Sequence, residues 1–289
     1  MSPDIVALIG FAALFSLMLL RVPVGMAMGL VGVCGFGYLT SFDTALKLVG
    51  QTTMRTVTDL NFGIIPMFLL MGAFVSHAGI SGEIFRAANA FIGHLRGGLG
   101  AATVLACGGF AAICGSSVAT AATFSAVAYP EMRRNGYPIS FATGVIAAGG
   151  TLGVMIPPST ILAVYGLITQ QDIGKLFIAG ILPGLVQILV LLATIWVIVR
   201  LRPDFLPRCD RATWAERLAA LREVWAPVTL FAFVIGGLYG GLFTATEAGG
   251  MGAAGAFIIG VLRGRLPLKA IKASLLEATR TAAAVFTIL

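Results

Sequence analysis

The feature that most constrains this chain is a run of 34 residues, 97–130, that contains no Asp, Glu, Lys, Arg or His. One helix crosses the hydrocarbon core of a bilayer with about 20 apolar residues, and two crossings need about 40 plus a turn. The run fits neither length. Of the 32 residues 98–129, 21 are Gly, Ala, Ser or Thr, and Gly115-Ser116-Ser117 stands near the middle. We therefore predict a re-entrant hairpin, in which two half-helices meet at a polar tip that protein or water must surround.

A second irregular segment follows directly. Residues 139–168 are apolar but are interrupted at 149–159 by the sequence GGTLGVMIPPS. Pro157 and Pro158 remove two amide donors, and each ring clashes with the preceding turn, so we predict a helix broken near its midpoint. A hairpin followed by a broken helix is typical of a transporter binding site. The alternative is a proline kink in an ordinary span, with the small residues serving close helix packing.

Composition sets the class of protein. Hydrophobic residues make up 58% of the chain and charged residues 11%, with a mean hydropathy of +0.98. A soluble domain normally has about a quarter charged residues, so we predict an all-α polytopic membrane protein. The net charge of +7 lies in short connectors, which indicates cytoplasmic loops rather than nucleic-acid binding. The four cysteines form no C-x-x-C pair and predict neither disulfides nor a metal site, and residues 1–4 lack the basic region of a signal peptide.

The remaining segments complete the predicted topology. Further spans are expected at 5–20, 24–40, 62–78, 176–199, 224–241 and 249–262. Residues 43–61 predict an interfacial segment, 81–96 an amphipathic surface helix, 131–137 a polar link and 200–223 a hydrophilic loop. The apolar run after Arg280 has nine residues, too few to cross a bilayer, so we expect the sequence to stop inside a helix, as a fragment unable to transport alone.

The basic residues can be tested against the rule that cytoplasmic loops carry the excess of Lys and Arg. With a re-entrant hairpin, 15 basic residues lie on one side and three (Lys47, Arg55 and Lys175) on the other, leaving Arg280 uncounted. A single crossing at 97–130 gives 14 against 4 instead. Charge alone therefore does not decide the hairpin. It does predict that the hairpin base and residues 200–223 are cytoplasmic and that Met1 is outside.

Three motifs resemble the signatures of one family. They are GSSVATA at 115–121, GTLGVMIPPS at 150–159 and GLFTATEA at 241–248. In this order they resemble the large membrane subunit, DctM-like, of tripartite ATP-independent periplasmic (TRAP) transporters. The chain departs from that pattern at Ala245, where the family usually has proline. It also departs in length, since family members continue through a second, inverted repeat.

The resemblance implies a fold and a set of partners. The fold is that of the ion-transporter superfamily, an elevator with the first inverted repeat and part of the second. Residues 1–80 would supply scaffold-type spans, 81–175 the transport-type region, and 176–289 further spans with the start of the second repeat. The family implies a multi-pass protein of the bacterial inner membrane that takes up an organic anion, such as a C4-dicarboxylate or a sialic acid. Its partners are a small four-helix (DctQ-like) subunit and a periplasmic binding protein. No cofactor is expected apart from Na⁺ as coupling ion.

Sodium favours oxygen ligands, which unwound backbone carbonyls provide without a buried charge. Carbonyls are expected to leave helical pairing at the tip, 116–120, and at the break, 153–158. The resemblance implies a sodium site at the residues Ser116, Ser117, Ala119, Thr120, Gly153, Ile156 and Pro158. It implies substrate contacts at Ser117, Thr120 and Ser159. Ser117 also suits the N-cap of the second half-helix, whose positive end would face a carboxylate. The alternative for these hydroxyls is hydrogen bonding to the carbonyl four residues earlier in a packed helix.

Other candidates are weaker. A position at the start of a helix explains Glu247 at least as well as ion coupling. His77 and His94 are expected at membrane boundaries, and Met67, Met71 and Met155 in packing. An intramembrane serine protease using Ser116 or Ser117 with His77 is a rival reading, but no nucleophile motif surrounds the serines. An ion channel is a second rival, and no pore-lining charge pattern supports it.

Overall fold

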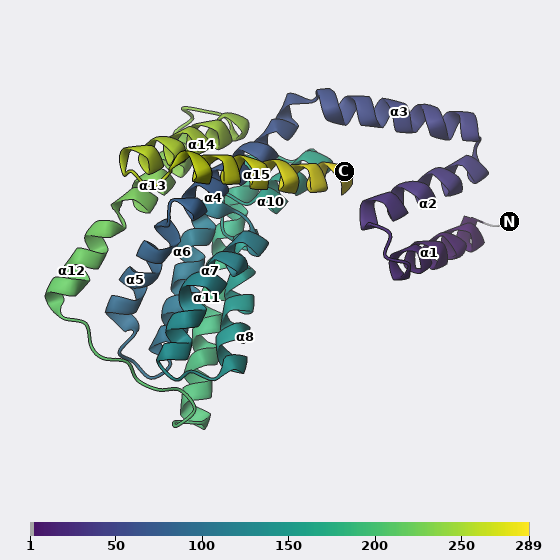
Figure 1. Ribbon diagram of the computed structural model, residues 1–289. Coiled ribbons are helices and arrows are strands. Elements are labelled where there is room, and N and C mark those ends of the chain that lie inside the picture. The colour runs from purple at the N-terminus through teal and green to yellow at the C-terminus, as the bar shows by residue number, and fades with distance from the viewer. Residues whose placement is uncertain (1–2, 289) are drawn as a thin grey trace. The chain divides into compact units, whose positions relative to one another are not determined.

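The computed structural model describes residues 3–288, and in that range every regular element is a helix (Figure 1). The first elements are α1 (Pro3–Leu19), α2 (Val24–Leu39), α3 (Phe42–Thr58), the 3₁₀ turn η1 (Leu60–Gly63), α4 (Ile64–His77) and α5 (Ile80–Ile92). They are followed by α6 (Gly98–Cys114), α7 (Ser117–Arg134), α8 (Ile139–Gly150), α9 (Leu152–Met155) and α10 (Thr160–Thr169). The last are α11 (Ile173–Leu201), α12 (Trp214–Glu223), α13 (Trp225–Tyr239), α14 (Ala245–Leu262) and α15 (Leu268–Ile288). The predicted all-α class is confirmed.

The helices form two compact units. One comprises residues 1–62 and 279–289, and the other residues 63–278. In the first unit, α1 and α2 are apolar helices of 17 and 16 residues. The helix α3 is amphipathic and begins where the side chain of Ser41 accepts a hydrogen bond from the amide of Thr44. That residues 43–61 are interfacial stays a prediction. The functional division at residues 80 and 175 stays a prediction.

The second unit is built around closely packed, glycine-rich helices. A Cβ added to Gly252 of α14 would lie 2.4 Å from the sulfur of Met71, and one added to Gly249 would lie 3.1 Å from Cβ of Met67. Met67 and Met71 of α4 are therefore packing residues, as predicted. Their side chains lie against α14 at two glycines, where α14 has no side chain. On the other side of α4, Gly72 leaves room for the carbonyl and thiol of Cys114 on α6.

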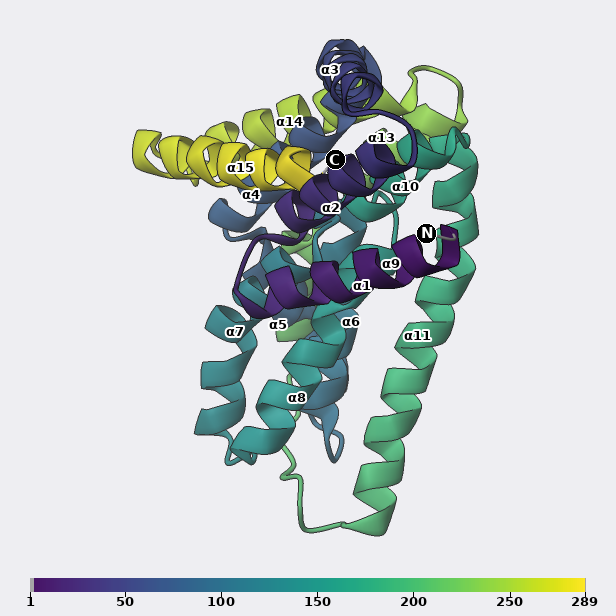
Figure 2. The same cartoon turned by 90° about the vertical axis from the view of Figure 1, so that its right-hand side faces the viewer.

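The uncharged run folds as a helical hairpin, α6 and α7, whose two ends meet at one base. The hydroxyl of Tyr137, just after α7, accepts from the amide of Leu99 at 3.3 Å and donates to the carbonyl of Pro207 at 3.2 Å. Burial raises the pKa of Tyr137 to about 12, so the hydroxyl keeps its proton. Figure 2 shows the α7–α8 connection and the loop after α11 at the same end. With 17 residues, α6 is about 25 Å long, shorter than a hydrocarbon core of about 30 Å. That the hairpin is re-entrant stays a prediction.

The broken helix is also present. The pair α8–α9 and the helix α10 are bent by 40° across residues 156–159. Three helical stretches are long and apolar enough to cross a membrane (Leu60–His77, Ile173–Leu201 and Ala245–Leu262), and two bent pairs, α8–α9 with α10 and α12 with α13, raise this to five. The chain is thus a multi-pass helical membrane protein by length and composition. The elevator arrangement stays a prediction.

Two local expectations need correction. The polar link expected at 131–137 is helical up to Arg134, because α7 continues past Pro130 and unwinds only at the turn around Gly136. The amphipathic helix expected at 81–96 is present as α5, but it ends at Ile92 and its buried side includes Glu83. Glu83 is buried because Arg263 binds both of its carboxylate oxygens, at 2.8 and 2.9 Å, and Arg265 binds one of them.

Candidate functional site

The hairpin tip is a turn of two residues between α6 and α7. Gly115 has a φ of +63°, in the left-handed region that favours glycine. Ser116 is extended, and its side chain accepts a hydrogen bond from the amide of Ala119 at 3.3 Å. Ser116 is therefore the N-cap of α7 and Ser117 is its first residue. The expectation that Ser117 forms the cap was wrong by one residue, since either serine has the required side chain and only the turn geometry selects between them.

The break owes its shape to the two prolines. In a continuous helix the amides of residues 157 and 158 would pair with the carbonyls of Gly153 and Val154. Proline has no amide hydrogen, so both carbonyls are left without these partners. Chain pairing resumes only at Ser159, whose side chain accepts from the amide of Leu162 at 3.3 Å and so caps α10.

The tip and the break are joined directly. The amide and the hydroxyl of Thr160, the first residue of α10, both donate to the carbonyl of Gly115, at 3.2 and 2.9 Å. A Cβ added to Gly115 would lie 2.4 Å from the carbonyl oxygen of Pro158, and one added to Gly153 would lie 2.6 Å from the carbonyl of Ser116. Two glycines therefore allow backbone to meet backbone, and we call this contact the tip–break junction (residues 112–120 and 151–160).

On the tip side, the carbonyls without a helical hydrogen bond are not the ones expected at 116–120. In the described part of the chain, the carbonyls of residues 112–114 and 153–158 accept no hydrogen bond. By contrast, the carbonyl of Ser116 accepts from both the amide and the hydroxyl of Thr120. On the tip side, free oxygens thus precede the Gly115 turn, because α7 begins at Ser117 and binds the carbonyls after it. The expected range 153–158 at the break is correct.

The structure brings the predicted site residues together, with different roles. Those in the tip are Ser116, Ser117, Ala119 and Thr120, and those in the break are Gly153, Ile156, Pro158 and Ser159. Thr120 is fully buried, and its hydroxyl donates to the carbonyl of Ser116 at 2.7 Å, which is the local bond weighed as the alternative. Ser117 is the predicted substrate residue that stays partly accessible, whereas Ser159 is fully buried in its cap. Binding of sodium or substrate by these residues stays a prediction.

The helix α11 also packs against the break, and the sequence analysis did not predict this contact. A Cβ on Gly180 of α11 would lie 2.7 Å from the carbonyl oxygen of Met155, and one on Gly184 would lie 2.8 Å from Ile156. One turn later, Gln187 donates to the hydroxyl of Thr151 at 2.6 Å, and that hydroxyl donates to the carbonyl of Ala148. The signal that could have found this contact is the pair of glycines four residues apart, which lets helices approach closely.

The junction has the electrostatics of an ion site without fixed charge. The ends of α6 and α9, with their negative partial charge, meet there with the starts of α7 and α10, which are positive. Residues 112–120 and 151–160 contain no Asp, Glu, Lys, Arg or His. Among residues 3–288 there is also no cluster of His, Cys, Asp and Glu that could hold a metal ion. Neutral oxygens of this kind suit a monovalent cation.

The weaker candidates have local explanations. Glu247 forms a capping box with Thr244, in which its carboxylate accepts from the amide and hydroxyl of Thr244 at 2.8 and 2.9 Å. The role at a helix start is confirmed. His77 lies within hydrogen-bond distance of the carbonyl of Ala73 at 2.9 Å and is 3.7 Å from Glu277, and no hydrogen bond in the described chain joins it to Ser116 or Ser117. The geometry of a serine–histidine pair is thus not formed.

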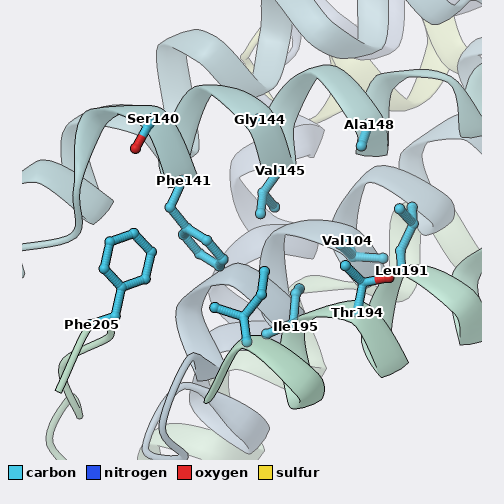
Figure 3. A pocket seen from close by; sticks show the side chains of 11 residues that line it. Val104, Ser140, Phe141, Gly144, Val145, Ala148, Leu191, Thr194, Ile195 and Phe205 are labelled. Carbon is cyan, nitrogen blue, oxygen red and sulfur yellow. The ribbon is translucent and has the colours of Figure 1, made fainter. Parts of the chain in front are cut away.

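A separate apolar cavity lies beside the hairpin, between α6, α8 and α11 (Figure 3). It has a volume of about 320 Å³ and is lined by Val104, Ser140, Phe141, Gly144, Val145, Ala148, Leu191, Thr194, Ile195, Ile198 and Phe205. Figure 3 shows the rings of Phe141 and Phe205 at one end. None of these residues belongs to the tip–break junction.

Comparison with known proteins gives the family. Residues 11–289 match the family described as the tripartite ATP-independent periplasmic transporter, DctM component. The chain belongs to the DctM family. Its recognition from the three sequence motifs is confirmed, and two of those motifs form the junction between hairpin and broken helix.

Curated DctM relatives are similar over most of this chain. The C4-dicarboxylate TRAP transporter large permease protein of Pseudomonas aeruginosa is 44% identical over 65% of the chain and 44% of the relative. Those of Vibrio cholerae and Rhodobacter capsulatus are each 37% identical, over 86% and 88% of the chain and 54% and 60% of the relatives. The chain thus spans about half the length of these relatives. All three are named as transporter permeases and none as an enzyme.

Proposed function

We propose that this DctM-family chain is part of the large permease subunit of a TRAP transporter in the bacterial inner membrane. The subunit imports an organic anion that a periplasmic binding protein delivers, and an inward sodium gradient drives the import. A small DctQ-like membrane subunit completes the transporter. C4-dicarboxylates are the first substrates to test, because that is the substrate named for the three relatives above.

The observation that carries the proposal is the contact between tip and break. Free carbonyl oxygens lie on both sides of it, and two helix starts point toward it. Carbonyls at helix C-terminal ends favour a cation, whereas helix N-terminal ends favour the carboxylate of a substrate. The residues that would take part are those predicted from the sequence, with the carbonyls of 112–114 added on the tip side.

The structure favours a transporter over both rivals. A serine protease needs a base within hydrogen-bond reach of the nucleophile, and here the Ser116 side chain accepts from Ala119 while His77 lies against Ala73 and Glu277. A selective channel built from charged rings would place ionisable side chains along its pore, and the junction segments have none.

Reconstitution tests the proposal. The complete reading frame that contains this chain is placed in vesicles with its small subunit, and a substrate-loaded binding protein is added outside. We expect uptake of a labelled C4-dicarboxylate with an inward sodium gradient and none with potassium in its place. Uptake that is indifferent to sodium would contradict the coupling, and anion flux without a binding protein would favour a channel.

A further inference from the structure

The three tryptophans of the chain share one arrangement. Trp196, Trp214 and Trp225 are 60%, 75% and 52% exposed. An arginine guanidinium lies over each ring, at 5.4 Å for Trp196 with Arg200, 5.1 Å for Trp214 with Arg217 and 5.6 Å for Trp225 with Arg263. Tryptophan collects where a membrane meets water, since its ring is apolar and its N–H is polar. Trp214 is the first residue of α12 and Trp225 is the first residue of α13. These two helices follow one another directly (Figure 1).

The helix α12 presents an apolar stripe outward. Trp214, Leu218 and Leu221 follow one another at spacings of four and three residues, which places them on one side of α12, and Trp225 follows as the first residue of α13. All four are more than half exposed. Arg217, beside the stripe, is buried instead, stacks on Phe91 and donates to the carbonyl of Ala90 at 3.1 Å. The contact with α5 therefore fixes which side of α12 faces outward.

This stripe is continuous with a membrane span. The helix α13 has 15 residues and is about 22 Å long, less than a hydrocarbon core of about 30 Å. Its first residue is Trp225, and tryptophan is the residue type that collects at the boundary of the hydrocarbon. Only Val224 separates Trp225 from α12, whose axis is bent by 42° from that of α13. The bend divides the α12–α13 pair, and with Trp225 at the boundary it would direct α12 into the adjoining headgroup layer.

The charges around the stripe fit anionic headgroups. Residues 200–223 contain six arginines and four carboxylates. Two of the carboxylates are engaged, Glu216 in the cap with Thr213 and Glu223 with Arg86 at 2.6 Å. Arg208, Arg211 and Arg222 form no ion pair with the described residues. Free arginines beside an apolar helical stripe are the combination that binds an anionic bilayer surface.

We propose that α12 is an interfacial helix. The stripe Trp214, Leu218, Leu221 and Trp225 inserts among acyl chains, and the arginines around it hold the headgroups of anionic phospholipids. The occupant of the stripe is thus the bilayer itself. This inference concerns the surface of the protein and does not depend on the transported solute or its coupling ion.

Tryptophan fluorescence tests the insertion. Replacing Trp196 and Trp225 with phenylalanine leaves Trp214 as the only tryptophan of residues 1–289, and the protein is reconstituted in phosphatidylcholine vesicles with brominated acyl chains. We expect strong quenching of Trp214 by the brominated lipid and weak quenching by acrylamide in the water. The matched control moves the tryptophan to the opposite side of α12 with Trp214→Phe and Ala219→Trp, and here acrylamide should be the stronger quencher.

The remaining results would overturn the proposal. Quenching of Trp214 by acrylamide alone would show a water-exposed loop, and quenching by neither agent would show that protein covers the stripe. Equal quenching at positions 214 and 219 would show that no side of the helix is inserted.

A second comparison tests the headgroup preference. At equal mole fraction, brominated phosphatidylglycerol should quench Trp214 about twofold or more beyond brominated phosphatidylcholine, because each arginine near a bilayer surface favours anionic lipid several-fold. The excess should fall in high salt and disappear in a variant with Arg208→Gln, Arg211→Gln and Arg222→Gln. An excess that survives these three substitutions would refute the role of the arginines.

Discussion

The amide and the hydroxyl of Thr160 both donate to the carbonyl of Gly115, 45 residues earlier in the chain. This pair of hydrogen bonds ties the tip of the α6–α7 hairpin to the second half of the broken helix. It also gives the carbonyl of Gly115 a partner. Gly115 lies between Cys114, whose carbonyl accepts no hydrogen bond, and Ser116, the N-cap of α7. These bonds therefore hold the hairpin tip beside the start of α10.

Removing the hydroxyl of Thr160 should loosen this tie. Thr160→Val keeps the shape and the amide bond but loses a buried hydrogen bond worth about 1 kcal/mol, or about fivefold in an equilibrium constant. We expect a several-fold rise in the sodium concentration that half-saturates uptake. Thr160→Ser is the control and should stay near wild type. Equal sodium dependence in all three proteins would show that the tie does not shape the site.

A side chain at Gly153 should weaken the response of uptake to sodium. A Cβ there would lie 2.6 Å from the backbone of Ser116, and backbone cannot yield as a flexible side chain can. We expect Gly153→Ala to fold but to respond to sodium much more weakly, and Gly153→Leu to be worse. Gly144→Ala in α8 is the matched control, since nothing lies within 4 Å of a Cβ at that position. A wild-type sodium response in Gly153→Ala would place the site elsewhere.

How far the sequence predicts this site depends on whether the cause is local. Gly115, Pro157 and Pro158 act on their own backbone, so the turn and the break could be predicted from residue type alone. The choice of Ser116 over Ser117 as N-cap depends on the exact turn, and it was missed by one residue. The bonds from Thr160 to Gly115 join distant segments, and no local pattern reports them. The spacing of Gly180 and Gly184 indicates a close helix contact but does not say that Met155 and Ile156 make it.

The hairpin base should lie on one side of the membrane. Tyr137 bonds both Leu99 and Pro207, so Arg96 and Arg133 lie near the same closed base. With Cys34, Cys107, Cys114 and Cys209 replaced, cysteines at positions 96 and 133 should both react with an impermeant thiol reagent only from the cytoplasmic side. Reaction of the two positions from opposite sides would mean that the run 97–130 crosses the membrane once.

Glu83 should be important for stability. Its carboxylate is buried with Arg263 and Arg265, so Glu83→Gln leaves two guanidinium groups short of their partner. Breaking a buried ion pair costs roughly 3–5 kcal/mol in the free energy of unfolding. We expect a marked drop in the thermal unfolding temperature in detergent. Arg134→Gln, which removes an exposed pair with Glu131 at 3.9 Å, should change it little. Similar effects of the two substitutions would contradict a stabilising role for the buried cluster.

The most direct test is equilibrium binding of radioactive sodium, in detergent, to the purified protein produced from the complete reading frame that contains this chain. If the tip–break junction is a sodium site, binding should be saturable, should resist competition by potassium, and should weaken strongly in Gly153→Ala while Gly144→Ala binds normally. Saturable sodium binding that is the same in both variants, or the absence of any saturable binding, would contradict the assignment of this junction as the ion site.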